Sequence, residues 1–182
     1  ASHDILYFAK FVKTLDRNAK GSFLDWFPIS KAYMRRLLTV AAKHPKLAIY
    51  KSRQMVVTWA MLLICLHEFL FKPGSVISVI SMTEKDAGKL LNKIYLMYQN
   101  LPAHWKIALP TIQKYNGKGG IIVRMVATFG DEPESSVEAC ATNGNPGRGQ
   151  TLSLAYWDEI GEQKDDECRH MYSALRPTLE GG

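Results

Sequence analysis

The order of short apolar runs and longer segments of helical periodicity limits this chain to few architectures. The runs at 47–50 and 76–80 are short and apolar, as is typical of buried strands. Segments with apolar residues at helical spacing follow at 58–71 and 83–98. Strands that alternate with helices predict an α/β fold, in which a largely parallel central sheet lies between layers of helices.

Further elements are predicted on both sides of this pattern. Apolar spacing indicates helices at 2–15, 30–43 and 163–175, with an aromatic loop at 21–28 and a loop at 176–178. Strands are expected at 111–115, 120–127, 136–140 and 152–157, the first two joined by the turn-prone Asn116-Gly117-Lys118-Gly119. Ligands of open α/β sheets bind beyond the carboxyl ends of the strands, so the polar loops after 47–50 and 152–157 are the candidate sites.

Composition favours one soluble, intracellular domain that spans residues 1–182. The 23 Lys and Arg outnumber the 17 Asp and Glu and give a net charge of +6, which favours a polyanionic partner such as nucleic acid. Three scattered cysteines do not make a disulfide framework, and no apolar segment is long enough to span a membrane. The sequence begins without an initiator Met, and we expect it to be a fragment of a longer protein.

The first candidate loop, from Lys51 to Thr58, has the length of a phosphate-binding P-loop. In a P-loop, backbone N–H groups surround the phosphates, a lysine neutralises them, and a Ser or Thr binds Mg²⁺. Thr58 stands at the Ser/Thr position, whereas Val56 and Val57 replace the second glycine and the lysine of the pattern. A β-branched residue is disfavoured at positive φ, so Val56 argues against the usual loop conformation. Lys51 and Arg53 are cations able to replace the lysine; the alternative is that they are solvated residues at a strand end.

The second candidate loop follows the apolar run 152–157 and begins with two adjacent carboxylates, Asp158 and Glu159. An apolar strand that ends in Asp-Glu is typical of a Walker B motif, in which the Asp serves the magnesium ion and the Glu polarises the attacking water. The alternative is that Asp-Glu only ends a strand and caps the next turn. The position of the pair about 100 residues after a loop of P-loop length favours the Walker B interpretation.

A glycine-rich segment at 144–149 surrounds a single arginine, Arg148. Glycines on both sides keep the backbone mobile and the guanidinium accessible, which suits an arginine finger that stabilises charge on a transferred phosphoryl group. The alternative is a flexible hairpin whose arginine contacts DNA phosphate or nothing.

Three segments together resemble the ATPase domain of the large terminase subunits, the DNA-packaging motors of tailed bacteriophages. They are Lys-Ser-Arg-Gln-Met before a Thr-Trp helix, Gly-Arg-Gly-Gln-Thr before Leu-Ser-Leu-Ala-Tyr-Trp-Asp-Glu, and the closing Leu-Arg-Pro-Thr-Leu-Glu. The resemblance implies a P-loop NTPase fold of the ASCE type, a three-layer sandwich whose sheet lacks a coupling strand at its C-terminal side. It also implies a metal-dependent nuclease domain that is absent from this chain.

The resemblance implies roles for individual residues as well. ATP is expected to contact the segment that matches the variant P-loop of the family: Lys51, Ser52, Arg53, Gln54, Met55, Val56, Val57 and Thr58. Within this loop, Lys51 contacts phosphate, Arg53 senses or stabilises the γ-phosphate, and Thr58 binds Mg²⁺. Asp158 and Glu159 match the Walker B magnesium ligand and catalytic base. Arg148 matches an arginine that in some members reaches into a neighbouring subunit's site.

The implied function is that of a motor that hydrolyses ATP with Mg²⁺ to move double-stranded DNA into a procapsid. The implied partners are double-stranded DNA, the portal protein, the small terminase subunit and further copies of the chain, which form a ring that is a pentamer by family resemblance. The implied location is the host cytoplasm, and no membrane is expected as a partner. The isolated fragment is expected to turn over ATP weakly or not at all. Candidate DNA-contacting residues are Lys85, Lys89, Lys93, Lys114 and Lys118.

Three alternatives to this function stay open. One is a helicase-like ATPase of the same ASCE class. Another is a catalytically degenerate module that binds only DNA or assembly partners, because Val56 and Val57 have removed its affinity for ATP. The least favoured is a metabolic P-loop enzyme that transfers phosphate to a small molecule, because the sequence contains no substrate-recognition motif.

Overall fold

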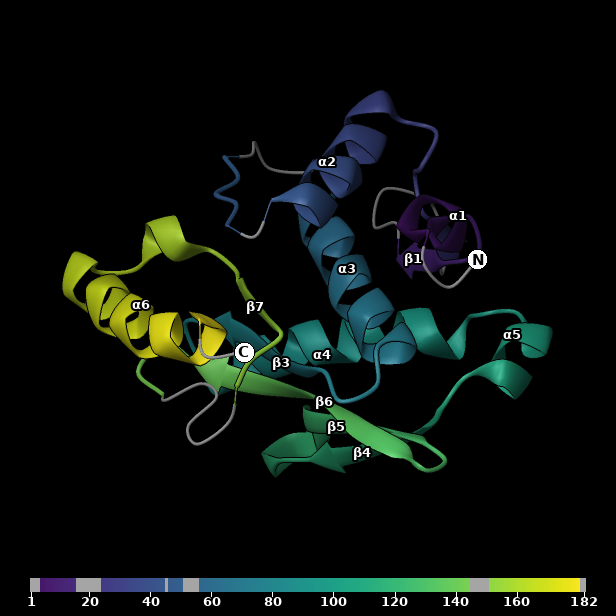
Figure 1. Ribbon diagram of the computed structural model, residues 1–182. Coiled ribbons are helices and arrows are strands. Elements are labelled where there is room, and N and C mark those ends of the chain that lie inside the picture. The colour runs from purple at the N-terminus through teal and green to yellow at the C-terminus, as the bar shows by residue number, and fades with distance from the viewer. Residues whose placement is uncertain (1–3, 16–23, 45, 51–55, 145–150, 181–182) are drawn as a thin grey trace.

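The computed structural model describes residues 4–15, 24–44, 46–50, 56–144 and 151–180, which form two sheets with helices around them (Figure 1). In chain order the elements are α1 (Ile5–Ala9), β1 (Lys13–Leu15), β2 (Leu24–Trp26), α2 (Ala32–Lys43), α3 (Val57–Phe71), β3 (Val76–Ser81), α4 (Glu84–Gln99), α5 (Ala103–Ala108), β4 (Thr111–Asn116), β5 (Ile122–Phe129), β6 (Glu132–Ala141), β7 (Leu154–Trp157) and α6 (Asp165–Glu180). Short 3-10 turns lie at Lys118–Gly120 and Ile160–Glu162. The α/β class predicted from the sequence is confirmed.

The central sheet has five strands in the order β4-β5-β6-β3-β7. β3 pairs in parallel with β6 on one side and with β7 on the other. β4, β5 and β6 pair antiparallel, and the β4–β5 hairpin is the one predicted at the turn after Asn116. The sheet is therefore mixed. It is parallel around β3, where long connections separate the paired strands in sequence, and antiparallel where short turns join them.

Helices cover both faces of this sheet, in the three-layer arrangement expected of the fold class (Figure 1). On one face, Ile77 and Val79 of β3 belong to the main core with residues of α3 and α4. On the other face, Ile80 of β3 packs with Met171 and Leu175 of α6. Because successive residues of a strand point to opposite faces, β3 contributes to both layers of the core.

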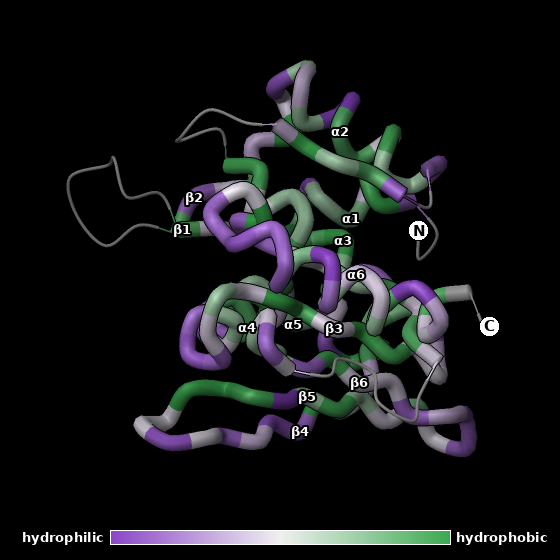
Figure 2. Tube along the Cα trace, turned by 90° about the vertical axis from the view of Figure 1, so that its left-hand side faces the viewer, coloured by the Kyte–Doolittle hydropathy of each residue, from purple (hydrophilic) through white to green (hydrophobic). Residues whose placement is uncertain are grey.

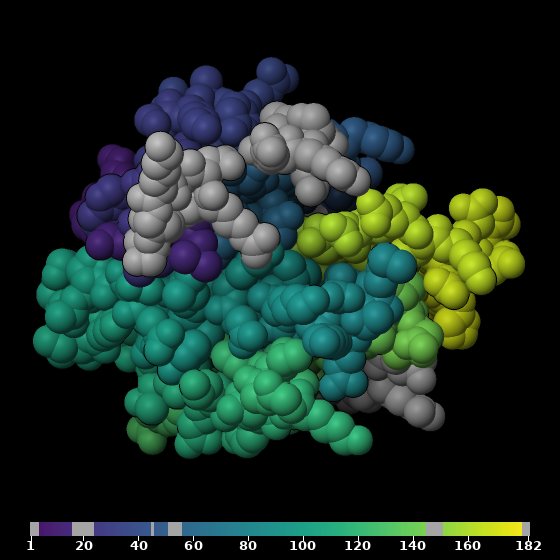
Figure 3. All heavy atoms as spheres, turned by 180° about the vertical axis from the view of Figure 1, so that it is seen from behind, coloured from purple at the N-terminus to yellow at the C-terminus, as the bar shows by residue number. Residues whose placement is uncertain are grey.

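The long apolar helix α3 lies at the centre of the molecule, where α1 and α2 pack against it. Its residues Leu62, Leu63, Leu66 and Phe69 have no exposed surface. Figure 3 shows the N-terminal elements, coloured purple and blue, resting on the teal central part, with the yellow helix α6 at one side. Within the part of the chain that the structure describes, no helix combines the length and the apolar character needed to cross a bilayer.

The two edge strands of the sheet are β4 and β7. Figure 2 shows that β4 is mostly hydrophilic, whereas its neighbour β5 is mostly hydrophobic. The residues of β4 are almost all exposed, and charged side chains such as Lys114 disfavour pairing of this edge with another chain. The other edge, β7, carries the second candidate loop.

The N-terminal segment differs from the single helix predicted at 2–15. α1 has only five residues and is capped by Asp4, whose side chain accepts the N–H of Leu6 at 2.9 Å. β1 then pairs antiparallel with β2, which lies in the predicted aromatic loop. Phe8 and Val12 are both fully buried, and the N–H of Phe27 donates to the carbonyl of Val12 at 2.9 Å. The apolar residues at helical spacing therefore form a short helix followed by a strand, and not one long helix.

The strand predicted at 47–50 is wrong, because these residues form no strand. Tyr50 is fully exposed, and Ile49 alone packs against the core. An apolar run forms a strand only where a neighbouring strand takes up its backbone hydrogen bonds, and the described residues supply no such neighbour.

The loop predicted at 176–178 is part of α6 instead, with Pro177 inside the helix. Proline has no N–H and costs a helix one hydrogen bond. Contacts on both sides of it hold the helix: Leu175 is buried against the sheet, and the carbonyl of Thr178 accepts the N–H of Leu152 at 2.8 Å. Tertiary packing here outweighs the local preference of proline.

Candidate functional site

Strand β7 brings the predicted Walker B pair to the carboxyl edge of the parallel strands. The N–H of Asp158 donates to the carbonyl of Ile80 at 2.9 Å and so extends the pairing of β3 with β7 by one residue. Asp158 is 9% exposed, whereas Glu159 is exposed to solvent. The two adjacent carboxylates therefore occupy different environments, one held within the protein and one open to an incoming water molecule.

Tyr156 fixes the Asp158 carboxylate. Its hydroxyl donates to Asp158 Oδ1 at 2.7 Å, which is a short hydrogen bond to a charged acceptor. Burial is the main reason that the pKa of Tyr156 is raised above its ordinary value, and the negative charge of Asp158 raises this pKa further. Tyr156 therefore keeps its proton at neutral pH and donates a hydrogen bond to Asp158.

Thr58, in the first turn of α3, forms a side-chain hydrogen bond with the same Tyr156 hydroxyl, and this contact acts to lower the pKa of Tyr156. Thr58 and Asp158 are far apart in sequence, yet they meet at one hydroxyl group. The sequence analysis named both residues but missed Tyr156. The signal that could have found it is strand alternation, because a residue two positions before Asp158 lies on the same face of β7.

The backbone has left-handed conformations at Val56, with φ of 58°, and at Glu159, with φ of 56°. Among the described residues other than glycine, these two alone have positive φ. Val56 precedes α3 and Glu159 follows Asp158, so both lie in the candidate loops. Such conformations cost about 1–3 kcal/mol each and cluster at functional sites. Val56, at the position of the second P-loop glycine, thus adopts a glycine-like conformation that its β-branched side chain disfavours.

The strain at Val56 leads to a prediction about stability. Val56→Gly and Val56→Ala both remove the contacts of the valine side chain with the core, but only glycine adopts positive φ without penalty. The free energy of unfolding of the Gly variant is expected to be about 1 kcal/mol higher than that of the Ala variant, so the Gly variant is the more stable of the two. Urea unfolding of the two variants measures this difference, and an Ala variant as stable as the Gly variant would contradict a left-handed residue 56.

The other predicted loop residues divide into two groups. Val57, at the position of the P-loop lysine, is 6% exposed and belongs to the hydrophobic core, so this position supplies no charge to a phosphate. The remaining predicted residues lie outside the described part of the chain: Lys51, Ser52, Arg53, Gln54, Met55 and Arg148.

Thr58 and Asp158 are suited to magnesium, although the described residues contain no group of three or more His, Cys, Asp or Glu side chains arranged for a metal ion. Mg²⁺ prefers oxygen ligands, keeps several waters, and is usually bound by one or two protein groups together with substrate phosphates. The carboxylate of Asp158 and the hydroxyl of Thr58, at the end of the predicted nucleotide-binding segment 51–58, satisfy this requirement. The donor set therefore fits a metal that arrives with a nucleotide.

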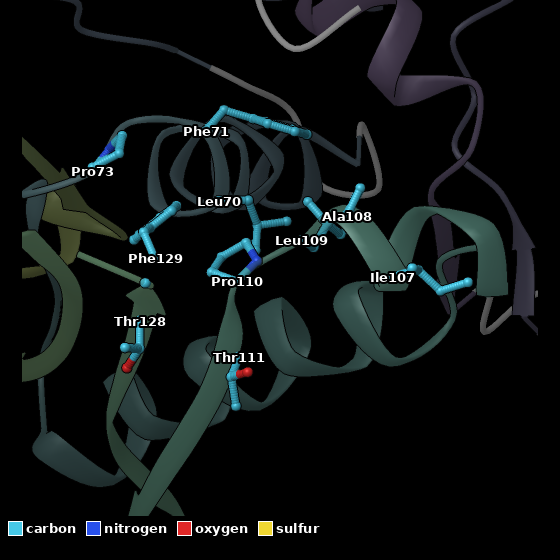
Figure 4. Close-up of a pocket in the computed structure, with 11 residues that line it drawn as sticks. Leu70, Phe71, Pro73, Ile107, Ala108, Leu109, Pro110, Thr111, Thr128 and Phe129 are labelled. Carbon is cyan, nitrogen blue, oxygen red and sulfur yellow. The ribbon is translucent and has the colours of Figure 1, made fainter. Parts of the chain in front are cut away.

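A pocket of about 480 Å³ lies at the other end of α3 (Figure 4). It is lined by residues such as Leu70, Phe71, Leu109 and Phe129, and none of its lining side chains is titratable. A helix of 15 residues is about 22 Å long, so this pocket is remote from Thr58 at the first turn of α3. The pocket therefore takes no part in the candidate chemistry.

Comparison with known proteins identifies the fold. No protein-family model matches the sequence, and a search of curated proteins finds no match. The crystal structure of the HK97 bacteriophage large terminase matches with a TM-score of 0.64 and 14% identity, over 100% of this chain and 35% of that chain. The large terminase ATPase domain of Thermus phage P74-26 matches with a TM-score of 0.50 and 18% identity, over 83% of this chain and 65% of that chain, and a mutant of that domain gives the same values.

The class defined by the fold is thus that of α/β proteins with a mixed five-stranded sheet between helices. Its particular form is the fold of the matched large terminase structures, which is the fold that the resemblance of the sequence implies. This chain spans less than two thirds of the length of either matched structure. At these identities the likeness establishes the fold, and activity and partners have to be argued from the site.

Proposed function

We propose that this chain is the ATP-hydrolysing domain of a terminase-type motor that moves double-stranded DNA into a procapsid. The observation that carries the proposal is the meeting of Thr58 and Asp158 at the Tyr156 hydroxyl. This meeting occurs at the carboxyl edge of the parallel strands, where α/β proteins bind nucleotides, in a fold shared with terminase ATPase domains.

The chain's own residues have distinct parts in the proposed reaction. Thr58 and Asp158 hold Mg²⁺, which when bound neutralises charge on the β- and γ-phosphates. Glu159, exposed beside the buried Asp158, accepts a proton from the attacking water. Lys51 and Arg53 contact the phosphates, and Arg148 completes the site from a neighbouring subunit.

The proposed setting is a ring of copies of this chain, five by the family resemblance. The ring is docked on the portal protein and acts with the small terminase subunit in the host cytoplasm. A site completed by Arg148 of a neighbour makes hydrolysis depend on ring assembly. This dependence is the reason that the isolated chain is expected to turn over ATP weakly.

The proposed DNA-contacting surface is the exposed face of α2, which we call the α2 basic face and define by Arg36 and Lys43. Residues 26–67 contain seven Lys and Arg and no Asp or Glu, so no acidic residue of that stretch offsets this charge. Arg36 and Lys43 are seven positions apart and lie opposite the buried Met34 and Leu38. In the described part of the chain, neither forms an ion pair. A row of unneutralised cations is suited to the phosphates of DNA.

Three of the five lysines first proposed as DNA contacts are already engaged within the protein. Lys89 pairs with Asp86 at 2.7 Å, and the same contact helps to hold the pKa of Asp86 below its ordinary value. Lys93 lies over the ring of Trp59, and Lys114 over the ring of Tyr95. We therefore favour the α2 basic face over these residues.

Nucleotide binding tests the proposal most directly. The unmodified chain is expected to bind a fluorescent ATP analogue with Mg²⁺, and Lys51→Ala is expected to weaken this binding at least about tenfold, because a cation at the phosphates is lost. Lys72→Ala is the matched control, because Lys72 lies at the far end of α3.

Two results would redirect the proposal. A chain that binds DNA but no nucleotide is the degenerate module, with Val56 and Val57 as the cause. Duplex unwinding coupled to hydrolysis selects the helicase-like alternative.

A further inference from the structure

Tyr156 joins two residues of the proposed magnesium site that in sequence are unrelated to each other. It lies on β7, and its ring packs against the main core. Its hydroxyl reaches Asp158 Oδ1 at 2.7 Å and also contacts the side chain of Thr58. The hydroxyl thus stands between the start of α3 and the end of β7.

Asp158, Tyr156 and Thr58 form a chain of two hydrogen bonds. The number of protons that each side chain can donate determines the direction of each bond. An ionised carboxylate only accepts, so the single proton of the Tyr156 hydroxyl is donated to Asp158. The Tyr156 oxygen is then an acceptor for Thr58, and the single proton of the Thr58 hydroxyl is used for that bond.

This direction determines which atoms remain available to a ligand. The oxygen lone pairs of Thr58 are directed away from its proton, and Asp158 keeps its second oxygen, Oδ2. Both groups therefore present lone pairs, as a Mg²⁺ ion or its bound water requires. Without the tyrosine hydroxyl, the Thr58 hydroxyl rotates and the Asp158 carboxylate loses a fixed partner.

We infer that Tyr156 is a positioning residue, which orients the Thr58 hydroxyl and the Asp158 carboxylate together toward a Mg²⁺ ion brought by the nucleotide. The inference rests on the proposed function and adds to it a residue outside the P-loop and Walker B patterns. Tyr156 contacts neither nucleotide nor metal in this role. It acts as the outer support of two ligands, as partners of metal ligands commonly do.

The test is Tyr156→Phe, which removes only the hydroxyl. A fluorescent ATP analogue is titrated with Mg²⁺ and again with EDTA, and the ratio of the two affinities measures how strongly the metal assists binding. In Tyr156→Phe this ratio is expected to fall about ten- to a hundredfold, the usual effect of losing a hydrogen bond to a charged group. Affinity in EDTA is expected to stay within about twofold of the original value. Tyr172→Phe is the matched control, because Tyr172 is 54% exposed on α6.

A second variant tests whether Tyr156 and Thr58 act together in metal-assisted nucleotide binding. Thr58→Val removes the other end of the same chain of hydrogen bonds, so the double variant with Tyr156→Phe is expected to lose clearly less metal assistance than the sum of the two single losses. Independent, additive losses would overturn the inference, as would a Tyr156→Phe chain with the original ratio. If the unmodified chain binds no nucleotide, or binds it equally with and without Mg²⁺, the proposed function fails together with this inference.

Discussion

Glu159→Gln is expected to reduce ATP turnover by about 10²–10⁴-fold, the usual contribution of a general base, while ATP binding stays unchanged. Glutamine has nearly the size of glutamate but cannot accept the proton of the attacking water. Glu159 is exposed and follows Asp158, so its loss leaves the proposed metal ligand in place. The left-handed backbone at Glu159, with φ of 56°, departs from the extended conformation of β7.

Phosphate release by the assembled ring measures this effect, since the isolated chain is expected to turn over slowly. Glu162→Gln is a suitable control, because Glu162 is an exposed carboxylate in the next turn of the chain. Hydrolysis by Glu159→Gln at the rate of the unmodified chain would remove Glu159 from the role of base.

Reversal of two charges on the α2 basic face, Arg36→Glu with Lys43→Glu, is expected to weaken binding to duplex DNA about a hundredfold at low salt. Each phosphate contact releases bound counterions, so the loss of two contacts is expected to reduce the slope of log affinity against log salt by about 2. Both side chains are exposed on the face opposite the core, so the fold is expected to be unaffected.

The comparison for this experiment is the double reversal Lys85→Glu with Lys89→Glu on α4. Lys89 already pairs with Asp86, so the α4 surface is partly neutralised and its reversal is expected to change DNA affinity much less. Fluorescence anisotropy with a labelled duplex over a series of salt concentrations measures both variants. Equal losses in the two variants would show that net charge, and not the α2 basic face, governs DNA binding.

Local sequence signals predicted well those elements whose ends are determined by short-range chemistry. The helical segment predicted at 83–98 corresponds to α4, and at its start the hydroxyl of Thr83 accepts the N–H of Asp86 at 3.1 Å. The glycine-containing turn after Asn116 was expected to join two strands, and it joins β4 to β5. In both cases the residues that decide the structure are neighbours in sequence.

Signals of the same kind failed where a distant partner decides the structure. The apolar run 47–50 resembles the run 76–80, but only the second run has strands on both sides. Pro177 suggested a loop, but burial of Leu175 keeps that segment helical. Periodicity describes which side chains are apolar and does not show which backbone groups find partners.

The sequence by itself determined the α/β class, the extent of the central helices, and the candidate pair Thr58 and Asp158, because these depend on periodicity and on the chemistry of single side chains. Only the tertiary structure decided that the two residues meet at the Tyr156 hydroxyl, that Val57 is buried in the core, and that Val56 adopts a glycine-like conformation. These features arise where α3 packs against β7, and a hydrogen bond or a backbone strain exists only once packing has brought both sides together.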